Sequence, residues 1–204
     1  MPTLAGSEPY PWPYDGCLDP ERLALLVAGA QTAWMEASCN YASVASAIAA
    51  ISAAVRDAGA QVVILHHSSP IGNRPTPFPP EPRSAGADPG VLPSGDDLVV
   101  RSGGIDGFHG GSLDDELRSR GIDHLVLCGF GAEACVDSTL RSANDRGYEC
   151  LTLTDAVAPF SHDLGRHALS SITMSGGIFG AIGSSDDLLD ALSLARPTVS
   201  LEAP

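Results

Sequence analysis

Short apolar runs alternate with amphipathic stretches along most of the chain. The runs predicted as strands cover residues 23–27, 61–66, 98–101, 124–129 and 148–156. Between the first two, Val44, Ile48, Ile51 and Val55 fall on one stripe of a helix that ends before Gly59. Further helices are predicted from Leu113 to about residue 121 and over residues 133–146, 162–171 and 185–194.

This alternation of strands and helices indicates an α/β fold with three layers, α-β-α, around a central, mostly parallel sheet of Rossmann-like topology. We expect one domain over residues 1–204, with an N-terminal arm (1–20) and a proline-rich loop (68–95). Ligands of such sheets bind beyond the carboxyl ends of the strands, so the residues just after the first four strands should surround one crevice.

The composition and net charge of the chain exclude some classes of binding partner. The 204 residues carry a net charge of −14, which disfavours nucleic acid and anionic membrane. No apolar run approaches the roughly 20 residues that span a bilayer, and the N-terminus lacks the features of a secretion signal. The five cysteines are widely spaced without a CxxC pair. We therefore expect no disulfide framework or structural zinc, a reducing compartment and a cytoplasmic protein.

The stretch LCGFGAEACVDST places Cys135 at the start of a predicted helix. Amides and the helix dipole at such a position lower the pKa of a thiol and can hold an oxyanion. The alternative is a small apolar residue packed at a helix start. His66, His67 and Asp106 follow strands and are candidate partners, although side-chain alternation lets only one of the two histidines face the crevice. The sequence GFGAEA has the first two glycines of a dinucleotide fingerprint and an alanine in third place, a variant that the motif allows. The acidic residue that should follow about 20 positions later is poorly placed, so no cofactor is expected.

The chain resembles the isochorismatase-like cysteine hydrolase superfamily. The resemblance is carried by the order and spacing of four segments and by a downstream histidine, His167. The segments are ALLVAGAQ (24–31), DLVVRSGGIDGFHGGSL (97–113), GIDHLVLCGFGAEACVDST (121–139) and RGYECLTLTDA (146–156). The opening PYPWPYDG (9–16) is similar to members that cleave ureidoacrylate and biuret. The resemblance implies hydrolysis by an Asp base, a Lys and a Cys nucleophile, with backbone amides as the oxyanion hole. The histidine pair lacks the Asp-x-His spacing of metal-using relatives, so no metal site is expected.

Position by position, the resemblance puts Gly29 where the family has Asp and Ser102 where it has Lys, while Cys135 is retained. Ala132 replaces a family Thr, and Thr139 agrees with the pattern. Oxyanion and binding positions are expected at Gly131, Ala132, Gln31, Phe108 and Trp34.

Neither glycine nor serine can replace a carboxylate or an ammonium group. Loss of one member of an interdependent catalytic set costs on the order of 10⁴ to 10⁶ in rate. We therefore expect a non-standard member that binds or converts a small metabolite without the Asp–Lys–Cys mechanism, for example by cyclisation, dehydration or isomerisation. The alternatives are an amide or ureide hydrolase with a His base, and a catalytically silent structural subunit. A homodimer or higher homo-oligomer is expected from the resemblance.

Overall fold

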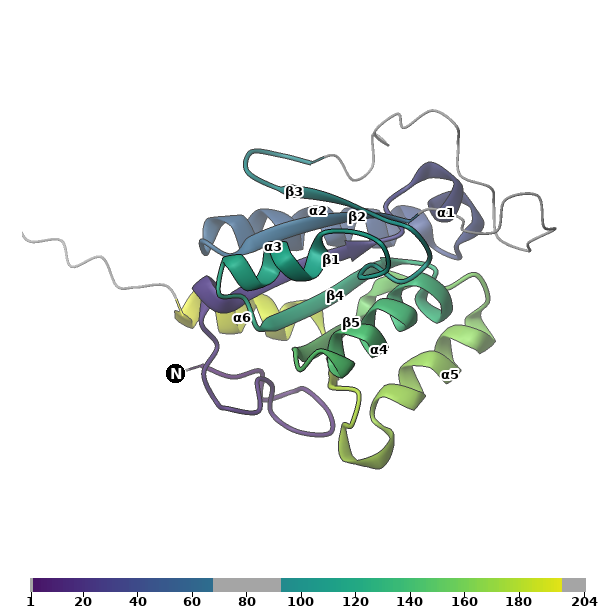
Figure 1. Ribbon diagram of the computed structural model, residues 1–204. Helices are drawn as coiled ribbons and strands as arrows, with labels where there is room; N and C mark the ends of the chain where they lie inside the picture. Colours follow the sequence, from purple (N-terminus) through teal and green to yellow (C-terminus); the bar gives the residue numbers. More distant parts are fainter. Residues whose placement is uncertain (1, 68–92, 196–204) are drawn as a thin grey trace, which may run out of the picture.

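The computed structural model describes residues 2–67 and 93–195, which form a six-stranded parallel sheet between two layers of helices (Figure 1). The strands are β1 (Leu23–Ala28), β2 (Gln61–His67), β3 (Leu98–Ser102), β4 (His124–Phe130), β5 (Glu149–Ala158) and β6 (Ala181–Gly183). The helices are α1 (Thr32–Ala37), α2 (Tyr41–Asp57), α3 (Leu113–Ser119), α4 (Asp137–Asp145), α5 (His162–Ile172) and α6 (Ser185–Ala195), with short helical turns η1 (Pro20–Arg22), η2 (Ala132–Val136) and η3 (Met174–Gly176). The predicted α/β class is confirmed.

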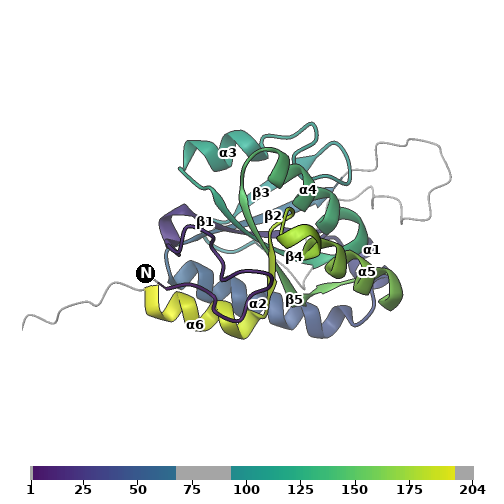
Figure 2. The same cartoon turned by 90° about the horizontal axis from the view of Figure 1, so that it is seen from below.

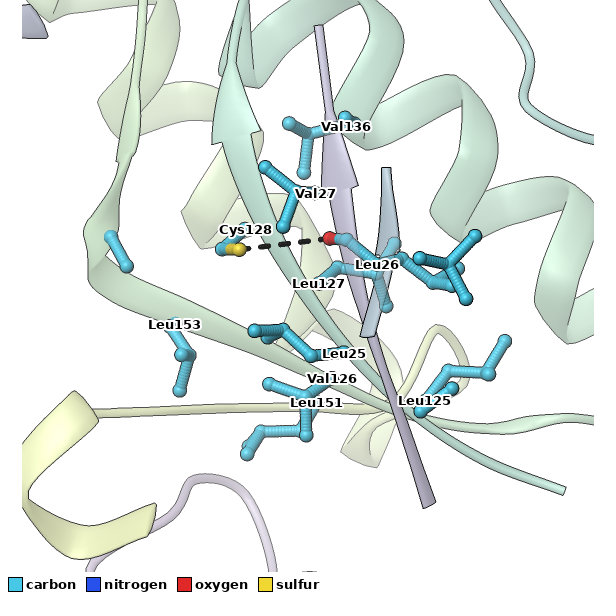
Figure 3. Packing of buried hydrophobic residues seen from close by; sticks show 14 of the residues in the cluster. Leu25, Leu26, Val27, Leu125, Val126, Leu127, Cys128, Val136, Leu151 and Leu153 are labelled. Atoms are coloured by element: carbon cyan, nitrogen blue, oxygen red, sulfur yellow. Dashed lines mark hydrogen bonds between the residues drawn. The ribbon is translucent and has the colours of Figure 1, made fainter. Parts of the chain in front are cut away.

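Helices cover both faces of the sheet. α2 and α6 pack together on one face, and α3 and α4 lie on the other (Figure 2). The central strands are buried along their whole length, which matches their continuous apolar sequences. Figure 3 shows leucine and valine side chains of β1, β4 and β5 interleaved there, with Cys128 Sγ donating to the carbonyl oxygen of Leu26 at 3.6 Å.

The strand order is β3-β2-β1-β4-β5-β6. The order reverses direction between β1 and β4, and crevices for ligands form at the carboxyl ends of strands flanking such a point. The register places Ala28 beside Gly129 there, and on the other side of β2 it places His67 beside Ser102. Segments far apart in the sequence are thereby brought to one end of the sheet.

The five predicted strands are all present, each within two residues of its expected ends. β6 and α1 were not predicted, because three and six residues are too short to show a period. The predicted helix over 133–146 is wrong at its start: a π-helical turn, η2, precedes α4. The predicted loop 68–95 falls mostly on residues 68–92, which lie outside the described part of the chain.

The N-terminal arm packs into the core. Leu4 and Trp12 are buried and pair across an isolated bridge. The Glu149 carboxylate accepts hydrogen bonds from the Tyr10 hydroxyl at 3.1 Å and from the Tyr14 amide at 3.0 Å. The first residues of the chain are therefore an integral part of the fold. Within residues 2–67 and 93–195, no helix has the length and apolar character needed to cross a membrane.

Candidate functional site

Cys135 lies in the turn that connects β4 to α4. Gly131 adopts a left-handed conformation with a φ of 71°, and η2 follows directly. The amide of Val136 reaches back five residues to the carbonyl oxygen of Gly131 at 3.4 Å, the spacing of a π-helical turn. This wide turn, rather than the first turn of an α-helix, positions the sulfur atom.

The sulfur atom is held as a neutral thiol. Cys135 is 0% exposed, and its Sγ donates to the carbonyl oxygen of Phe130 at 2.8 Å. Burial raises the pKa of this thiol, hydrogen bonds from the amides of Cys135 and Val136 lower it, and the Glu133 carboxylate raises it. A thiolate placed as close to the Phe130 oxygen would bring two electron-rich atoms together, so this geometry requires the S–H proton. The acceptor of that proton is a backbone carbonyl, which cannot act as a base near neutral pH.

Gly29, where the resemblance implies an Asp, lies against this thiol. Its φ is +64°, a conformation that favours glycine. A Cβ atom at Gly29 would lie 2.5 Å from the Phe130 oxygen and 2.9 Å from Cys135 Sγ. The backbone of β4 therefore fills the space that a side chain at position 29 would need.

Ser102, where the resemblance implies a Lys, is buried at the end of β3. Its hydroxyl donates to the carbonyl oxygen of Gly104 at 2.7 Å, and its Oγ lies 3.2 Å from Nδ1 of His67. The two residues are register partners on β3 and β2. The serine thus completes a polar contact with the histidine.

His67 is the buried member of the histidine pair, and His66 is half-buried. The Gln31 side chain binds both backbone groups of His67: Nε2 donates to the His67 carbonyl at 3.0 Å, and Oε1 accepts from the His67 amide at 2.9 Å. Burial lowers the pKa of His67 from 6.5 to about 4, opposed by a hydrogen bond to the Gly104 carbonyl and reinforced by His66. The ring is therefore neutral near pH 7.

Two aromatic rings cover the turn that carries the thiol. Trp34 and Phe160 lie 5.4 Å apart between ring centroids. A Cβ atom at Gly131 would be 2.9 Å from Phe160 and 3.1 Å from Trp34, so the glycine lets both rings approach the backbone. The amide of Gly131, an expected oxyanion donor, already donates to the carbonyl oxygen of Ala158 at 2.7 Å.

Two other expected site residues have structural partners. Asp106 accepts a hydrogen bond from the amide of Phe108 at 2.9 Å and so closes its own turn. The Phe108 ring packs against Tyr148, with 5.7 Å between centroids, and beneath the guanidinium group of Arg146.

The last two positions that the resemblance singled out also lie in packed surroundings. The buried Ala132 lines a small hollow beneath α5, together with Val136 and Thr152. Thr139 accepts a hydrogen bond from the amide of Gly107 at 2.9 Å.

Sequence reasoning identified Glu133 as a neighbour that raises the pKa of the Cys135 thiol, but it missed the carbonyl of Phe130 and the hydrogen bonds that the Glu133 carboxylate accepts. Glu133 accepts from the amides of Phe160 and Ser161, at 3.1 Å each, and so fixes the start of α5. A backbone acceptor has no sequence signal, and the partners of Glu133 are 27 and 28 residues away. Among the residues that the structure describes, no three His, Cys, Asp or Glu side chains lie together as a metal site would require.

Known proteins share both the sequence pattern and the fold. The family description "Isochorismatase domain" matches residues 23–186. Ureidoacrylate amidohydrolase RutB from Variovorax paradoxus is 36% identical over 107 residues, which cover 52% of this chain and 41% of that protein. An uncharacterized isochorismatase family protein from Bacillus subtilis, YddQ, is 31% identical over 103 residues, covering 50% of this chain and 57% of the relative. The matched part is thus less than two thirds of either relative's length.

Among solved structures, an isochorismatase family protein from Burkholderia thailandensis superposes with a TM-score of 0.74 at 26% identity, over 86% of this chain and 97% of that chain. A cysteine hydrolase from Pseudomonas syringae gives a TM-score of 0.72 at 22% identity, over 87% and 95%, which shows the shared fold. The family match includes every strand of the sheet and the turn that carries Cys135, and the chain belongs to the isochorismatase family.

Proposed function

We propose that this chain is an isochorismatase-family protein that binds or converts a small uncharged metabolite at the carboxyl ends of β1 to β4 without a cysteine nucleophile. The observation that carries the proposal is the hydrogen bond from Cys135 Sγ to the Phe130 carbonyl oxygen, at 2.8 Å. It holds the sulfur as a thiol. A thiol attacks carbonyl carbons poorly, because the thiolate is the nucleophile.

The two positions at which the resemblance implies charged groups support the same conclusion. A carboxylate base needs a side chain at position 29, and the Phe130 oxygen stands 2.5 Å from where its Cβ would be. At position 102 the serine hydroxyl is bound to Gly104 and His67. Neither position supplies a charge, and the charge of Glu133 opposes ionisation of the thiol.

The second candidate, a hydrolase that uses a histidine as base, is disfavoured by the acidities of the two groups. The ordinary pKa of a thiol, 9.0, lies about 5 units above that of His67, and burial raises the thiol further. Both shifts oppose transfer of the proton from sulfur to this imidazole. The homology to a ureidoacrylate amidohydrolase nevertheless makes amide and ureide cleavage the activity to test first.

The test is turnover of ureidoacrylate and of simple carboxamides by the purified chain, followed as ammonia release and compared with Cys135→Ala. We expect the two proteins to show the same background rate. Turnover that Cys135→Ala abolishes would overturn the proposal. Alkylation by iodoacetamide at pH 7 gives an independent readout: Cys39, which is partly exposed, should react well before Cys135.

Restoring the family residues should not restore hydrolysis. In Gly29→Asp/Ser102→Lys, the new aspartate meets the β4 backbone at a positive φ, so we expect a marked loss of stability and no ammonia release. Gly59→Asp is the matched control, because Gly59 also has a positive φ (84°) but no atom within 4 Å of its Cβ position. Gly29→Asp alone should lower the melting temperature more than Gly59→Asp.

A further inference from the structure

A cleft of about 530 Å³ opens at the end of the sheet opposite Cys135. It lies where β1 and β2 begin and where the chain enters β3 and β4, so several elements contribute to its walls. Its apolar lining includes Pro20, Leu23, Val62 and Ile122. Leu23, Val62 and Ile122 are each at most 3% exposed and form an apolar floor. This cleft is separate from the candidate site around the thiol.

The two arginines that line the cleft already have counter-charges. Arg56 Nε and Nη2 donate to the two carboxylate oxygens of Asp97, at 2.8 and 2.6 Å, and the Asp97 side chain is only 2% exposed. Arg120 Nη1 donates to the Glu116 carboxylate at 2.5 Å. Each guanidinium group thus lies beside a carboxylate, which weakens its attraction for a further anion.

Two further carboxylates line the cleft without a counter-charge. The side chains of Glu21 and Asp96 make no hydrogen bond or ion pair within the part of the chain that the structure describes. Helices α2 and α3 both end beside the cleft, and the C-terminus of a helix carries a partial negative charge. The cleft therefore has a negative potential, which favours a cation.

The side chain of Gln61 adds a fixed hydrogen-bond acceptor to the lining. Its Nε2 donates to the carbonyl oxygens of Val62 and Asp96, at 2.9 and 3.1 Å, which occupies both N–H groups and holds the amide in place. Its Oε1 meets no donor among the described residues and can accept from an N–H group. A positively charged N–H donor with an aliphatic body matches the acceptor, the negative potential and the apolar floor together.

We propose that this cleft binds a small aliphatic ammonium ion, a diamine or polyamine with short methylene segments. The ammonium groups lie beside Glu21 and Asp96, with Gln61 Oε1 as a further acceptor, and the methylene groups cover the apolar floor. The inference goes beyond the proposed function, because the cleft lies at the other end of the sheet and uses no residue of the candidate site.

Isothermal titration calorimetry with 1,4-diaminobutane at fixed ionic strength tests the proposal, and 1,4-butanediol is the matched probe without charge. We expect saturable binding of the diamine and none of the diol. In NMR spectra recorded during the titration, the amide resonances of Gly59, Ala60 and Gln61, which line the cleft, should shift. Those around Cys135 should stay in place.

Two double variants separate binding in the cleft from diffuse attraction to an acidic protein. Glu21→Gln/Asp96→Asn removes the two unpaired carboxylates of the cleft, and Glu36→Gln/Asp190→Asn removes two exposed carboxylates elsewhere. Both reduce the net charge of −14 by two units, so they weaken diffuse attraction equally. We expect the cleft variant to bind the diamine about five- to tenfold more weakly, and the control to stay within about twofold of the wild type.

Three results would overturn the inference: no saturable binding of the diamine, equal binding of the diol, or equal weakening in the two double variants. The first two need only the wild-type protein, and the four substituted side chains are exposed, so the variants should fold. Melting temperatures check this. Ammonia release that depends on Cys135 would overturn the proposed function and leave the diamine titration unaffected.

Discussion

At the scale of single residues, one backbone carbonyl decides the chemistry of the candidate site. The oxygen of Phe130 accepts the Cys135 proton and also fills the space beside Gly29. Position 29 therefore lacks a carboxylate for two reasons: the residue is glycine, and the backbone around it leaves no room for a side chain. A second residue of this kind is His67, whose buried imidazole is neutral near pH 7 because burial lowers its pKa.

His67 should make the stability of the protein depend on pH. Burial lowers its pKa from 6.5 to about 4, so the unfolded chain binds more protons than the folded chain between these values. Stability from this group is complete above pH 6.5 and is lost as pH falls to 4, by about 3 kcal/mol in total. Chemical unfolding from pH 7 to pH 4 measures it. His67→Asn, which does not titrate, should lose about that much less, and parallel curves for the two proteins would contradict the assignment.

At the scale of elements, a side chain of the turn η2 holds the connection between β5 and α5 in place. The carboxylate of Glu133 accepts the amides of Phe160 and Ser161, and Ser161 is the N-cap residue of α5. The same connection carries the ring that covers the thiol turn together with Trp34. One side chain beside Cys135 therefore controls the position of the aromatic cover.

Removing this carboxylate should loosen the connection. Glu133→Ala leaves two amides without their acceptor, and we expect a loss of about 1–3 kcal/mol in unfolding free energy. Hydrogen exchange at the amides of Phe160 and Ser161 should accelerate, while Glu133→Gln keeps an acceptor oxygen and should lose less. Glu116→Ala is the control, because its ion pair with Arg120 is exposed and contributes roughly 0.5 kcal/mol or less. An equal effect of Glu133→Ala and Glu116→Ala would show that the two amides do not depend on Glu133.

At the scale of the whole molecule, the N-terminal arm completes the core. Trp12 is fully buried, and its ring packs against His124 at the amino end of β4. The arm also bonds to Glu149 on β5 and to Ile182 on β6. These contacts lie at the end of the sheet opposite Cys135 or along its edge, so the arm acts on stability and not on the site.

Truncating the arm's buried ring should cost a large share of the total stability. Trp12→Ala is expected to lower the free energy of unfolding by about 3–5 kcal/mol, as for other buried tryptophans. Tyr14→Ala, two residues away, removes a side chain that is 78% exposed and should cost less than about 1 kcal/mol. Denaturant titration of both variants checks this, and similar losses would mean that the arm does not pack as described.

The sequence alone determined the fold class and the identities at the decisive positions. Short continuous apolar runs, rich in Val, Ile and Leu, are typical of strands in the interior of a parallel sheet, so β1, β2 and β4 were predictable from local pattern. The resemblance located Cys135, Gly29 and Ser102, and glycine and serine carry no charge in any conformation.

Tertiary structure decided what those residues do. The contact between His67 and Ser102 spans 35 residues and depends on the register of β2 with β3. The close approach of the Phe130 oxygen to Gly29 follows from how β1 and β4 end beside one another. Local sequence patterns report which residues are buried, but only the assembled sheet fixes which polar atoms meet.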